Sequence, residues 1–363
     1  MSRIAVAGLW HQGSVVSACL AHLGHAVVGV AEDPSVVANL NRGVPPVYEP
    51  GLSAMIRRNI RAGRLQYTAS YPGALRSASL VFIALDTPVK ADDAADLEPI
   101  LRAARNVREQ CRRPGILCIS AQVPLGTCDL IERLVNAGKS KALEVAYVPE
   151  FLRLGTALSS FLQPDRIIIG ADAAVAKKLS LLYKPLRRPI LTMDRRAAEM
   201  AKHASNAYLA TSISFSNEIS DLCERHGADI RPVLRALQMD RRIGPHAFLS
   251  PGLGFAGGTL GREIRSLQQL GKRARVGTPL LDAVWKVNRG WARVVPDRLR
   301  RILRSLKGKR IGILGLTYKP GTSTMRRAIS LQIMRNLLDD RRLTRAGFLC
   351  YGVGRPITRQ GSS

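Results

Sequence analysis

The first 30 residues set the strongest constraint on the fold of this chain. Residues 3–8 form an apolar run that ends in Gly8, residues 15–23 repeat apolar side chains at helical spacing up to Gly24, and residues 26–30 form a second apolar run. A strand, a helix and a strand in this order predict a βαβ unit. Such units combine into doubly wound sheets that carry helices on both faces. We therefore expect an α/β protein.

The turn between the first strand and the helix contains part of a dinucleotide-binding fingerprint. That fingerprint reads G-x-G-x-x-G, and the chain has Gly8 and Gly13 at its first and third glycines but Trp10 at the second. The second glycine normally lets the backbone approach a pyrophosphate, so Trp10 weakens the match. Glu32 and Asp33 follow the second strand, where a ribose-binding acid belongs. Either acid could instead cap the helix that follows.

Four further apolar runs predict buried strands, and three of them lead into polar loops. The runs cover residues 80–85, 116–120, 145–148 and 165–170. Thr87, Gln122 and Glu150 follow the first three. Ligands of doubly wound sheets bind at the carboxyl ends of the strands, which makes Thr87 and Gln122 candidates for binding the cofactor and Glu150 a candidate for catalysis. The alternation of strands and helices predicts six or more strands in residues 1–192.

The middle of the chain changes to helical patterns. Residues 197–226 repeat apolar side chains at helical spacing without glycine or proline, and Lys202 and Asn206 share one face of that helix because they are four residues apart. Further helical patterns cover residues 229–239, 262–273 and 278–305. We expect a helical domain over residues 193–305, of a kind that often forms a dimer interface.

A glycine-rich loop interrupts this helical region at residues 252–263. Five glycines in ten residues disfavour the interior of a helix or a strand, because glycine loses the most entropy when it is ordered. They suit a loop whose backbone N–H groups approach an anion. Taken alone, the loop could equally be an ordinary turn.

Charge and cysteine content limit the class of protein. The formal net charge is +28, from 55 Lys and Arg against 27 Asp and Glu, which favours an anionic ligand or partner. The basic residues are spread along the chain without a basic stripe interleaved with aromatics, which argues against nucleic acid. The six cysteines are scattered and form no C-x-x-C pair, which favours reduced thiols in a cytoplasm over disulfides or a metal site.

The two ends of the chain carry two further expectations. No apolar stretch is long enough for a membrane-spanning helix, and the N-terminus enters a strand without a leader pattern. An α/β pattern restarts at residues 308–316, but only 55 residues follow position 308. A second sheet domain needs roughly 100 residues, so we expect residues 306–363 to form an incomplete α/β segment.

In their order along the chain, these motifs resemble the UDP-glucose/GDP-mannose dehydrogenase family. The resemblance runs from residue 3 to about residue 340 and rests on several segments taken together. They are the glycine-bounded βαβ start, Y-E-P-G-L at 48–52, Thr87-Pro88, V-P-L-G-T at 123–127, P-E-F-L-R at 149–153, Lys202 with Asn206, Phe215-x-Asn217-Glu218, the glycine loop, and residues 315–326. The resemblance implies a Rossmann-like NAD domain, a helical dimerisation domain and a nucleotide-sugar domain.

The same resemblance implies an activity and a set of roles. Members oxidise the C6 alcohol of a nucleotide-linked hexose to a carboxylate and reduce two NAD⁺, with a loop cysteine that forms a thiohemiacetal and then a thioester. The matching positions imply that Lys202 and Asn206 stabilise oxyanions and that Glu150 serves acid/base chemistry. Segments that hold the nucleotide sugar match Phe151, Leu152, Phe248, Leu249 and Gly252, while Arg242 matches an arginine that reaches the neighbouring subunit's ligand and Arg326 one near the uridine site.

Several positions depart from the family pattern. Thr259 stands at the position of the nucleophilic cysteine, and Glu263 stands at that of the aspartate four residues later. A threonine hydroxyl is a poor nucleophile unless a base activates it, so the covalent route is in doubt. Ala31 stands where the family has its ribose acid, and Gln122 where it has a threonine.

Two hypotheses follow from the sequence. In the first, the protein is an NAD-dependent nucleotide-sugar dehydrogenase, with UDP-glucose to UDP-glucuronate as the leading reaction, in polysaccharide synthesis. It would be a cytoplasmic homodimer and would either stop at the aldehyde or oxidise the aldehyde hydrate. In the second, it is an impaired or non-catalytic homologue that binds a nucleotide sugar or a partner. Lys202, Asn206 and Glu150 favour the first hypothesis, whereas Thr259 and Trp10 favour the second.

Overall fold

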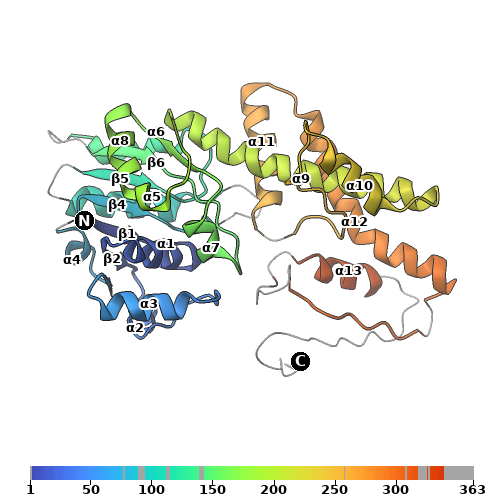
Figure 1. The fold of residues 1–363 in the computed structure, drawn as a ribbon, viewed down its shortest axis with the longest axis horizontal. Helices are drawn as coiled ribbons and strands as arrows, with labels where there is room; N and C mark the ends of the chain where they lie inside the picture. Colours follow the sequence, from blue (N-terminus) through green and yellow to red (C-terminus); the bar gives the residue numbers. More distant parts are fainter. Residues whose placement is uncertain are drawn as a thin grey trace. The chain divides into compact units, whose positions relative to one another are not determined.

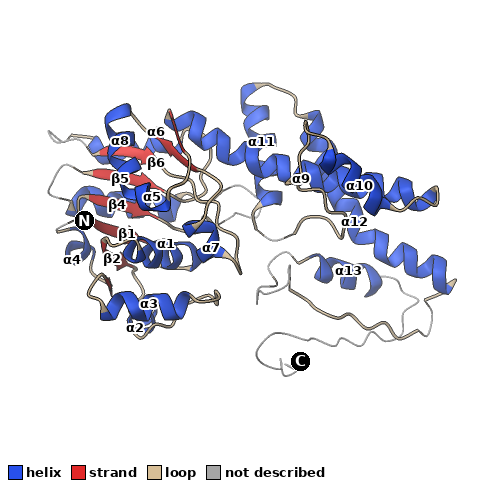
Figure 2. Ribbon diagram, viewed as in Figure 1, coloured by secondary structure: helices blue, strands red, loops and turns tan. Residues whose placement is uncertain are grey.

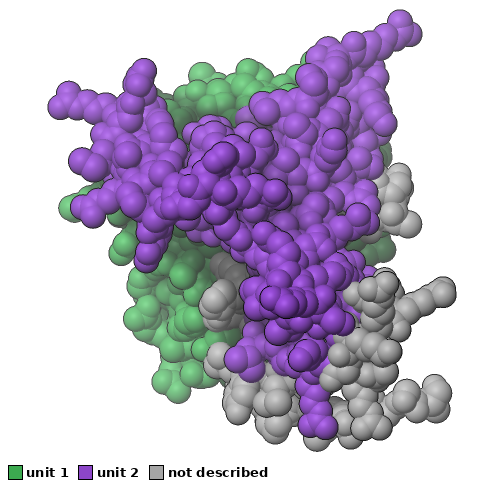
Figure 3. Space-filling model, turned by 90° about the vertical axis from the view of Figure 1, so that its right-hand side faces the viewer, with its two compact units in different colours: residues 1–202 green, residues 203–363 purple. Residues whose placement is uncertain are grey.

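The computed structural model of the chain describes residues 2–76, 78–88, 95–111, 115–138, 143–256, 258–306, 309–317, 325 and 328–338. The chain divides into two compact units, residues 1–202 and residues 203–363, which Figure 3 colours separately. The division falls inside one long helix, α9 (Arg195–Arg225). Each unit is described by itself.

The first unit is built on one eight-stranded sheet (Figures 1 and 2). Its strand order is β3-β2-β1-β4-β5-β6-β7-β8, and every neighbouring pair is parallel except β6 and β7. The order of the first six strands is that of a Rossmann fold. The strands are β1 (Arg3–Ala7), β2 (Ala26–Val30), β3 (Leu65–Thr68), β4 (Leu80–Ile83), β5 (Ile116–Ile119), β6 (Glu144–Tyr147), β7 (Ile167–Gly170) and β8 (Ile190–Met193).

Helices cover both faces of this sheet because its strands are apolar on both sides. Along β1, Ile4 and Val6 belong to one buried cluster, while Ala5 and Ala7 belong to another. Successive side chains of a strand point to opposite faces, so the two clusters are the two cores of a doubly wound sheet. The helices are α1 (His11–His22), α2 (Pro34–Asn41), α3 (Leu52–Arg61), α4 (Tyr71–Leu75), α5 (Glu98–Gln110), α6 (Thr127–Asn136), α7 (Ala157–Leu162), α8 (Ala173–Tyr183) and the short η1 (Lys184–Leu186).

The second unit consists of helices and loops in its described part, with one bridge residue at Leu314. After α9 it contains α10 (Ile230–Met239), α11 (Leu260–Ala274), α12 (Pro279–Leu303) and α13 (Ile329–Leu338). One buried cluster joins α9, α11 and α12 around Phe255 and Ile264, and another joins α12 and α13 around Ile333. In the described part of the chain, no helix combines the length and apolar character needed to cross a bilayer.

The predicted fold class is confirmed, including the doubly wound sheet and the helical middle region. The sequence analysis did not anticipate β3 and β8, which are the two edge strands. β3 alternates apolar and polar residues and Thr192 interrupts β8, so neither stands out as a continuous apolar run like β4 or β5, which have the same length.

Candidate active site

The turn that joins β1 to α1 requires glycine at both retained fingerprint positions. Gly8 has φ +93°, a backbone conformation that side chains disfavour. A Cβ added to Gly13 would lie 1.7 Å from the carbonyl oxygen of Gly8, which is inside van der Waals contact. The two glycines therefore keep the turn tight and leave the N-terminus of α1 open to an anion, as a bound dinucleotide needs.

Trp10 does not break this turn. Its φ of −74° is accessible to any residue, so the backbone needs no glycine at this position. The indole is 54% exposed and does not fill the core. The turn therefore keeps its course without a glycine at position 10, and the remaining departure is an exposed aromatic side chain where glycine would let the backbone approach a pyrophosphate.

Two further predicted cofactor residues are linked at the carboxyl ends of β4 and β5. The Thr87 hydroxyl donates a hydrogen bond to the backbone oxygen of Gln122 (2.6 Å). The Gln122 Nε2 atom is buried and has no hydrogen-bond partner among the described residues. An unpaired buried donor is costly, and a polar ligand at this edge of the sheet would satisfy it. Together with the turn after β1, these groups fit a dinucleotide.

The acids after β2 have local partners. The Asp33 carboxylate accepts a hydrogen bond from the backbone N–H of Ser35 (2.8 Å) and caps α2. Hydrogen bonds from the Ser35 side chain and then from its backbone N–H lower the pKa of Asp33. The Glu32 carboxylate lies 3.2 Å from Nε of Arg102, and both side chains are more than half exposed. Asp33 therefore plays the capping role that the sequence left open. Ribose binding by either acid stays a prediction.

The structure brings Lys202, Glu150 and Phe151 together at the end of β6. The Lys202 ammonium donates a hydrogen bond to the backbone oxygen of Glu150 and lies 4.4 Å from the centre of the Phe151 ring. The Glu150 carboxylate accepts a hydrogen bond from the backbone N–H of Leu152 (2.5 Å). Lys202 is only 6% exposed, so its positive charge is held in a largely water-free place. Such a charge interacts strongly with an anion that forms nearby.

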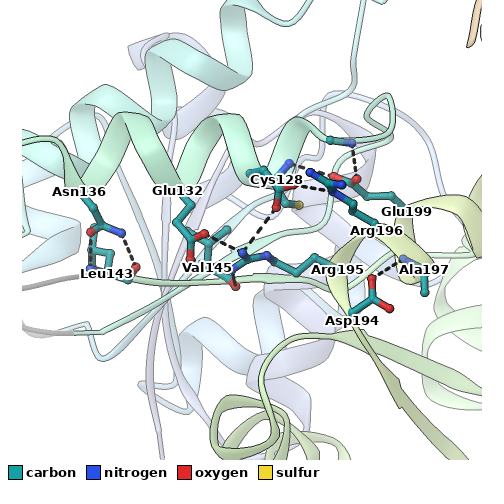
Figure 4. A network of polar contacts seen from close by, with 12 residues as sticks. Cys128, Glu132, Asn136, Leu143, Val145, Asp194, Arg195, Arg196, Ala197 and Glu199 are labelled. Carbon is teal, nitrogen blue, oxygen red and sulfur yellow. Dashed lines mark hydrogen bonds and ion pairs between the residues drawn. The ribbon is translucent and has the colours of Figure 1, made fainter. Parts of the chain in front are cut away.

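A network of polar contacts fixes the start of α9 and with it Lys202 (Figure 4). The buried Glu199 carboxylate accepts hydrogen bonds from the backbone N–H groups of Gly126 (2.6 Å) and Cys128 (2.8 Å), at the N-terminus of α6. Arg195 pairs bidentately with Glu132 (2.6 and 2.7 Å). Lys202 lies one turn after Glu199, so these contacts set where its ammonium can reach.

In the second unit, asparagine side chains hold the glycine loop. Oδ1 of Asn288 accepts from the backbone N–H of Phe255 (2.7 Å), and Nδ2 of Asn288 donates to the backbone oxygen of Phe255 (3.0 Å). The backbone N–H of Gly252 donates to Oδ1 of Asn217 (2.8 Å). A Cβ on Gly254 would lie 2.5 Å from Oδ1 of Asn288, which explains a glycine at that position.

The residues at the cysteine and aspartate positions of the family differ in burial. Thr259 is exposed, and although it stands at the N-cap of α11, its side chain makes no capping hydrogen bond. Glu263 is 1% exposed and bonds to Nδ1 of His203. Asn206 is 6% exposed, and its Nδ2 has no hydrogen-bond partner among the described residues. The hydroxyl is thus accessible, while the carboxylate is held in the interior.

A cavity of about 440 Å³ lies in the second unit next to the glycine loop. Phe255 and Trp285 contribute aromatic walls, and Arg289, Arg293 and Arg335 contribute positive charge. No carboxylate lines it among the described residues. Its lining therefore suits an anionic ligand with a planar ring.

The remaining predicted substrate residues lie on the surface of the second unit or outside its described part. Phe248 is 48% exposed and Leu249 is half-buried. Arg242 pairs with Asp240 (2.6 Å) and is largely exposed. Arg326 lies outside the described residues. These positions leave the predicted roles untested.

The sequence analysis missed His203, Glu199 and Asn288 as residues that support the site. His203 directly follows Lys202, and that adjacency was the one available signal. Glu199 and Asn288 lie within helices. The apolar spacing of a helix does not indicate which residues its polar side chains bind, and the partners of these two residues are far away in the chain.

Two family models match this chain. The NAD binding domain of the UDP-glucose/GDP-mannose dehydrogenase family matches residues 2–187, and the central domain of that family matches residues 196–290. The chain belongs to this family. It is accordingly an NAD-dependent oxidoreductase of the class that acts on CH–OH groups.

Individual relatives agree with this assignment. A UDP-glucose 6-dehydrogenase of Bacillus subtilis (strain 168), YwqF, is 39% identical over 338 residues, which cover 92% of this chain and 77% of the relative. A UDP-glucose 6-dehydrogenase of Pseudomonas aeruginosa is 37% identical over 346 residues, 93% of this chain and 76% of the relative. The solved UDP-glucose dehydrogenase of Pyrobaculum islandicum superposes with a TM-score of 0.90 at 36% identity, over 96% of this chain and 82% of that one.

Family membership assigns NAD binding to the sheet of the first unit.

The described cysteines in the core of this unit are too deeply buried to replace a catalytic thiol. Burial raises the pKa of the Cys19 and Cys118 thiols, and burial together with the Glu199 carboxylate raises that of Cys128. A thiol with a raised pKa supplies little thiolate at neutral pH, so none of the three replaces a nucleophile at position 259.

Proposed function

We propose that this protein oxidises the C6 alcohol of a UDP-linked hexose, with UDP-glucose as the substrate and UDP-glucuronate as the product. The observation that carries the proposal is the buried Lys202 ammonium at the backbone oxygen of Glu150, where β6 ends. UDP-glucose dehydrogenases among the relatives at 35–39% identity support the choice of sugar. Bound NAD⁺ supplies the acceptor for the hydride that leaves C6.

The side chains take distinct roles in this proposal. The Lys202 ammonium stabilises the negative charge that develops on the sugar's O6, and the Glu150 carboxylate receives the proton. Asn206 lies one turn beyond Lys202 on α9, and its Nδ2, which has no partner in the described part of the chain, is a second donor for the same oxygen. A buried amide donor without a partner is costly, and a ligand oxygen that accepts from it removes that cost.

The second oxidation proceeds without a covalent intermediate in our proposal. Thr259 offers an accessible hydroxyl and no thiol, and the Glu263 carboxylate is committed to His203. The hydroxyl holds a water molecule that adds to the C6 aldehyde, and the resulting hydrate is oxidised to the acid. The hydrate loses an O–H proton to solvent through the Glu150 carboxylate and transfers the C6 hydride to a second NAD⁺, which leaves the carboxylic acid.

The deciding experiment counts NADH formed per UDP-glucose consumed by the purified full chain, before and after alkylation with iodoacetamide. We expect two NADH per sugar and little loss of activity on alkylation. We expect Thr259→Cys to make the enzyme sensitive to iodoacetamide, because it restores a reactive thiol. Lys202→Met should lower kcat by at least about a hundredfold, as removal of an oxyanion donor does. Lys178→Met, an exposed lysine paired with Glu144, is the matched control.

Other results would redirect the proposal. One NADH per sugar with an aldehyde that hydroxylamine traps would mean that the reaction stops after the first oxidation. No NADH with UDP-glucose, GDP-mannose or related sugars, while a relative works alongside, would favour the non-catalytic homologue that Thr259 also suggests.

We further propose that the cavity beside the glycine loop receives the nucleotide part of the substrate. Arg289, Arg293 and Arg335 supply charge for a diphosphate, and Trp285 supplies a flat surface for a base. Replacement of Arg293 by Ala should raise the Kd for UDP by at least about tenfold, since a charge-assisted hydrogen bond is lost. An unchanged Kd would exclude this cavity as the nucleotide site.

Assembly, compartment and cellular role are also proposals. Tyr208, Phe215 and Leu222 recur every seven residues on α9 and are 64%, 46% and 51% exposed, which supports a homodimer through the central helices. Light scattering of wild type and Leu222→Glu tests it, and a wild-type monomer would exclude it. Cys19, Cys118 and Cys223 form no disulfide in the described part of the chain, which supports a cytoplasmic location. A uronate product would serve polysaccharide synthesis. We retain the three domains at 1–192, 193–305 and 306–363.

A further inference from the structure

The loop after β2 is the place where dinucleotide-binding sheets distinguish NAD from NADP. A carboxylate there accepts a hydrogen bond from the ribose 2′-hydroxyl of NAD and repels the 2′-phosphate of NADP, whereas an arginine nearby binds that phosphate. In this chain the residue directly after β2 is Ala31. Its methyl group can neither bind the hydroxyl nor repel the phosphate.

The two acids that follow Ala31 do not restore this selection. The Asp33 carboxylate already caps α2 through the backbone N–H of Ser35 at 2.8 Å. The Glu32 carboxylate lies 3.2 Å from Nε of Arg102, with its side chain 56% exposed. Ion pairs between exposed side chains are weak, so the replacement of Glu32 by a phosphate group as the partner of Arg102 costs little free energy.

Arg102 is well placed for such an exchange. It projects from α5 to the loop after β2, and its side chain is 55% exposed. The contact with Glu32 uses Nε, and Nη1 and Nη2 form no hydrogen bond with a described residue, although the Glu98 carboxylate one turn earlier on α5 lies within electrostatic reach of Arg102. These two nitrogens form part of the fork that binds a phosphate bidentately. All of these residues belong to the first unit.

We propose that Ala31 and Arg102 allow this protein to bind NADP⁺ as well as NAD⁺, with Arg102 holding the 2′-phosphate. The proposal rests on the proposed function, because it assumes that a dinucleotide lies across the carboxyl ends of β1 and β2. Glu32 turns to solvent when the phosphate binds. This chain then lacks the acid that an NAD-selective protein has directly after β2, and an arginine on α5 supplies the side chain that binds the 2′-phosphate.

The test measures binding of NAD⁺ and of NADP⁺ to the purified full chain by isothermal titration calorimetry. We expect the two Kd values to agree within tenfold. Arg102→Ala should raise the ratio of the NADP⁺ Kd to the NAD⁺ Kd at least tenfold, and Ala31→Asp should do the same by restoring the acid. Arg105→Ala removes the same charge one turn further along α5, from an ion pair with Glu98 at 2.7 Å. As the matched control it should leave the ratio within twofold of wild type.

Three outcomes would overturn the proposal. The first is NADP⁺ binding at least a hundredfold weaker than NAD⁺ binding in the wild type. The second is an equal change of the ratio of the NADP⁺ Kd to the NAD⁺ Kd in Arg102→Ala and in Arg105→Ala. That result would mean that the phosphate responds to the overall positive charge of α5 and not to a contact with Arg102. In both cases NAD⁺ still binds, so the proposed function stands. The third is binding of neither dinucleotide, which would overturn both proposals together.

Discussion

Gly13 approaches the carbonyl oxygen of Gly8 so closely that a Cβ on Gly13 would lie 1.7 Å from that oxygen. The approach brings the first turn of α1 directly over the end of β1. This approach explains the glycine at position 13, and the φ of +93° explains the glycine at position 8, although Trp10 replaces the glycine between them.

We expect Gly13→Ala to disrupt the first unit. The added methyl group cannot fit without moving either β1 or α1, and overpacking of a close-packed region costs about 1–3 kcal/mol or more. The measurement is the midpoint of urea unfolding, read with NAD⁺ affinity. Gly290→Ala is the control, because Gly290 lies within α12 and a Cβ there would meet nothing within 4 Å. That change should be neutral or stabilise by up to about 1 kcal/mol.

Glu199→Ala should destabilise the protein by about 2–5 kcal/mol. Without the carboxylate, the backbone N–H groups of Gly126 and Cys128 lose their acceptor, and buried unpaired donors carry a full desolvation cost. Arg196→Ala breaks an ion pair on the same turn of α9 whose arginine is 71% exposed, so it should cost less than about 1 kcal/mol. Equal shifts in the urea midpoint for the two variants would contradict the role assigned to Glu199.

Asn288→Ala should loosen the glycine loop and raise the Kd for UDP-glucose by about tenfold or more. The substitution removes both hydrogen bonds to Phe255, and each contributes about 1 kcal/mol. Titration calorimetry gives the affinity, and limited proteolysis reports whether the loop opens. Lys286→Ala, an exposed position two residues earlier on α12, should change neither. Binding of UDP-glucose at wild-type affinity by Asn288→Ala would separate the loop from the substrate.

Stability should fall as the pH drops below about 6.5, in part through His25. Burial lowers the pKa of His25 in the folded protein, while its Nδ1 lies 3.4 Å from the backbone N–H of Ser2. The unfolded chain therefore takes up the proton first, at its ordinary pKa near 6.5, and acid favours unfolding. One such proton changes the unfolding free energy by at most about 1.4 kcal/mol per pH unit. His25→Gln should show a shallower decline between pH 7 and pH 5, and an identical decline would exclude His25 as a source.

The sequence by itself determined the order of elements and most of the candidate residues. The apolar runs of β1, β2, β4, β5 and β6 and the helical spacing of α9 are local patterns, and they read correctly without knowledge of their partners. Glu150 was predicted from its place after β6, and Lys202 from its one-turn spacing to Asn206, both together with the family motifs. The edge strands β3 and β8 were missed because short mixed strands carry no comparable pattern.

Only the tertiary structure decided what holds the candidate residues in place. Glu199 and Cys128 are 71 positions apart, and Asn288 and Phe255 are 33 apart. Glu32 follows β2, whereas Arg102 lies on α5, after β3 and β4 in the chain. Their contact in the fold is the observation on which the proposal of NADP⁺ binding rests. A hydrogen bond or an ion pair depends on distance and direction in space, which side-chain periodicity does not encode. The sequence therefore determined which chemical groups are available, and the fold decided which of them meet.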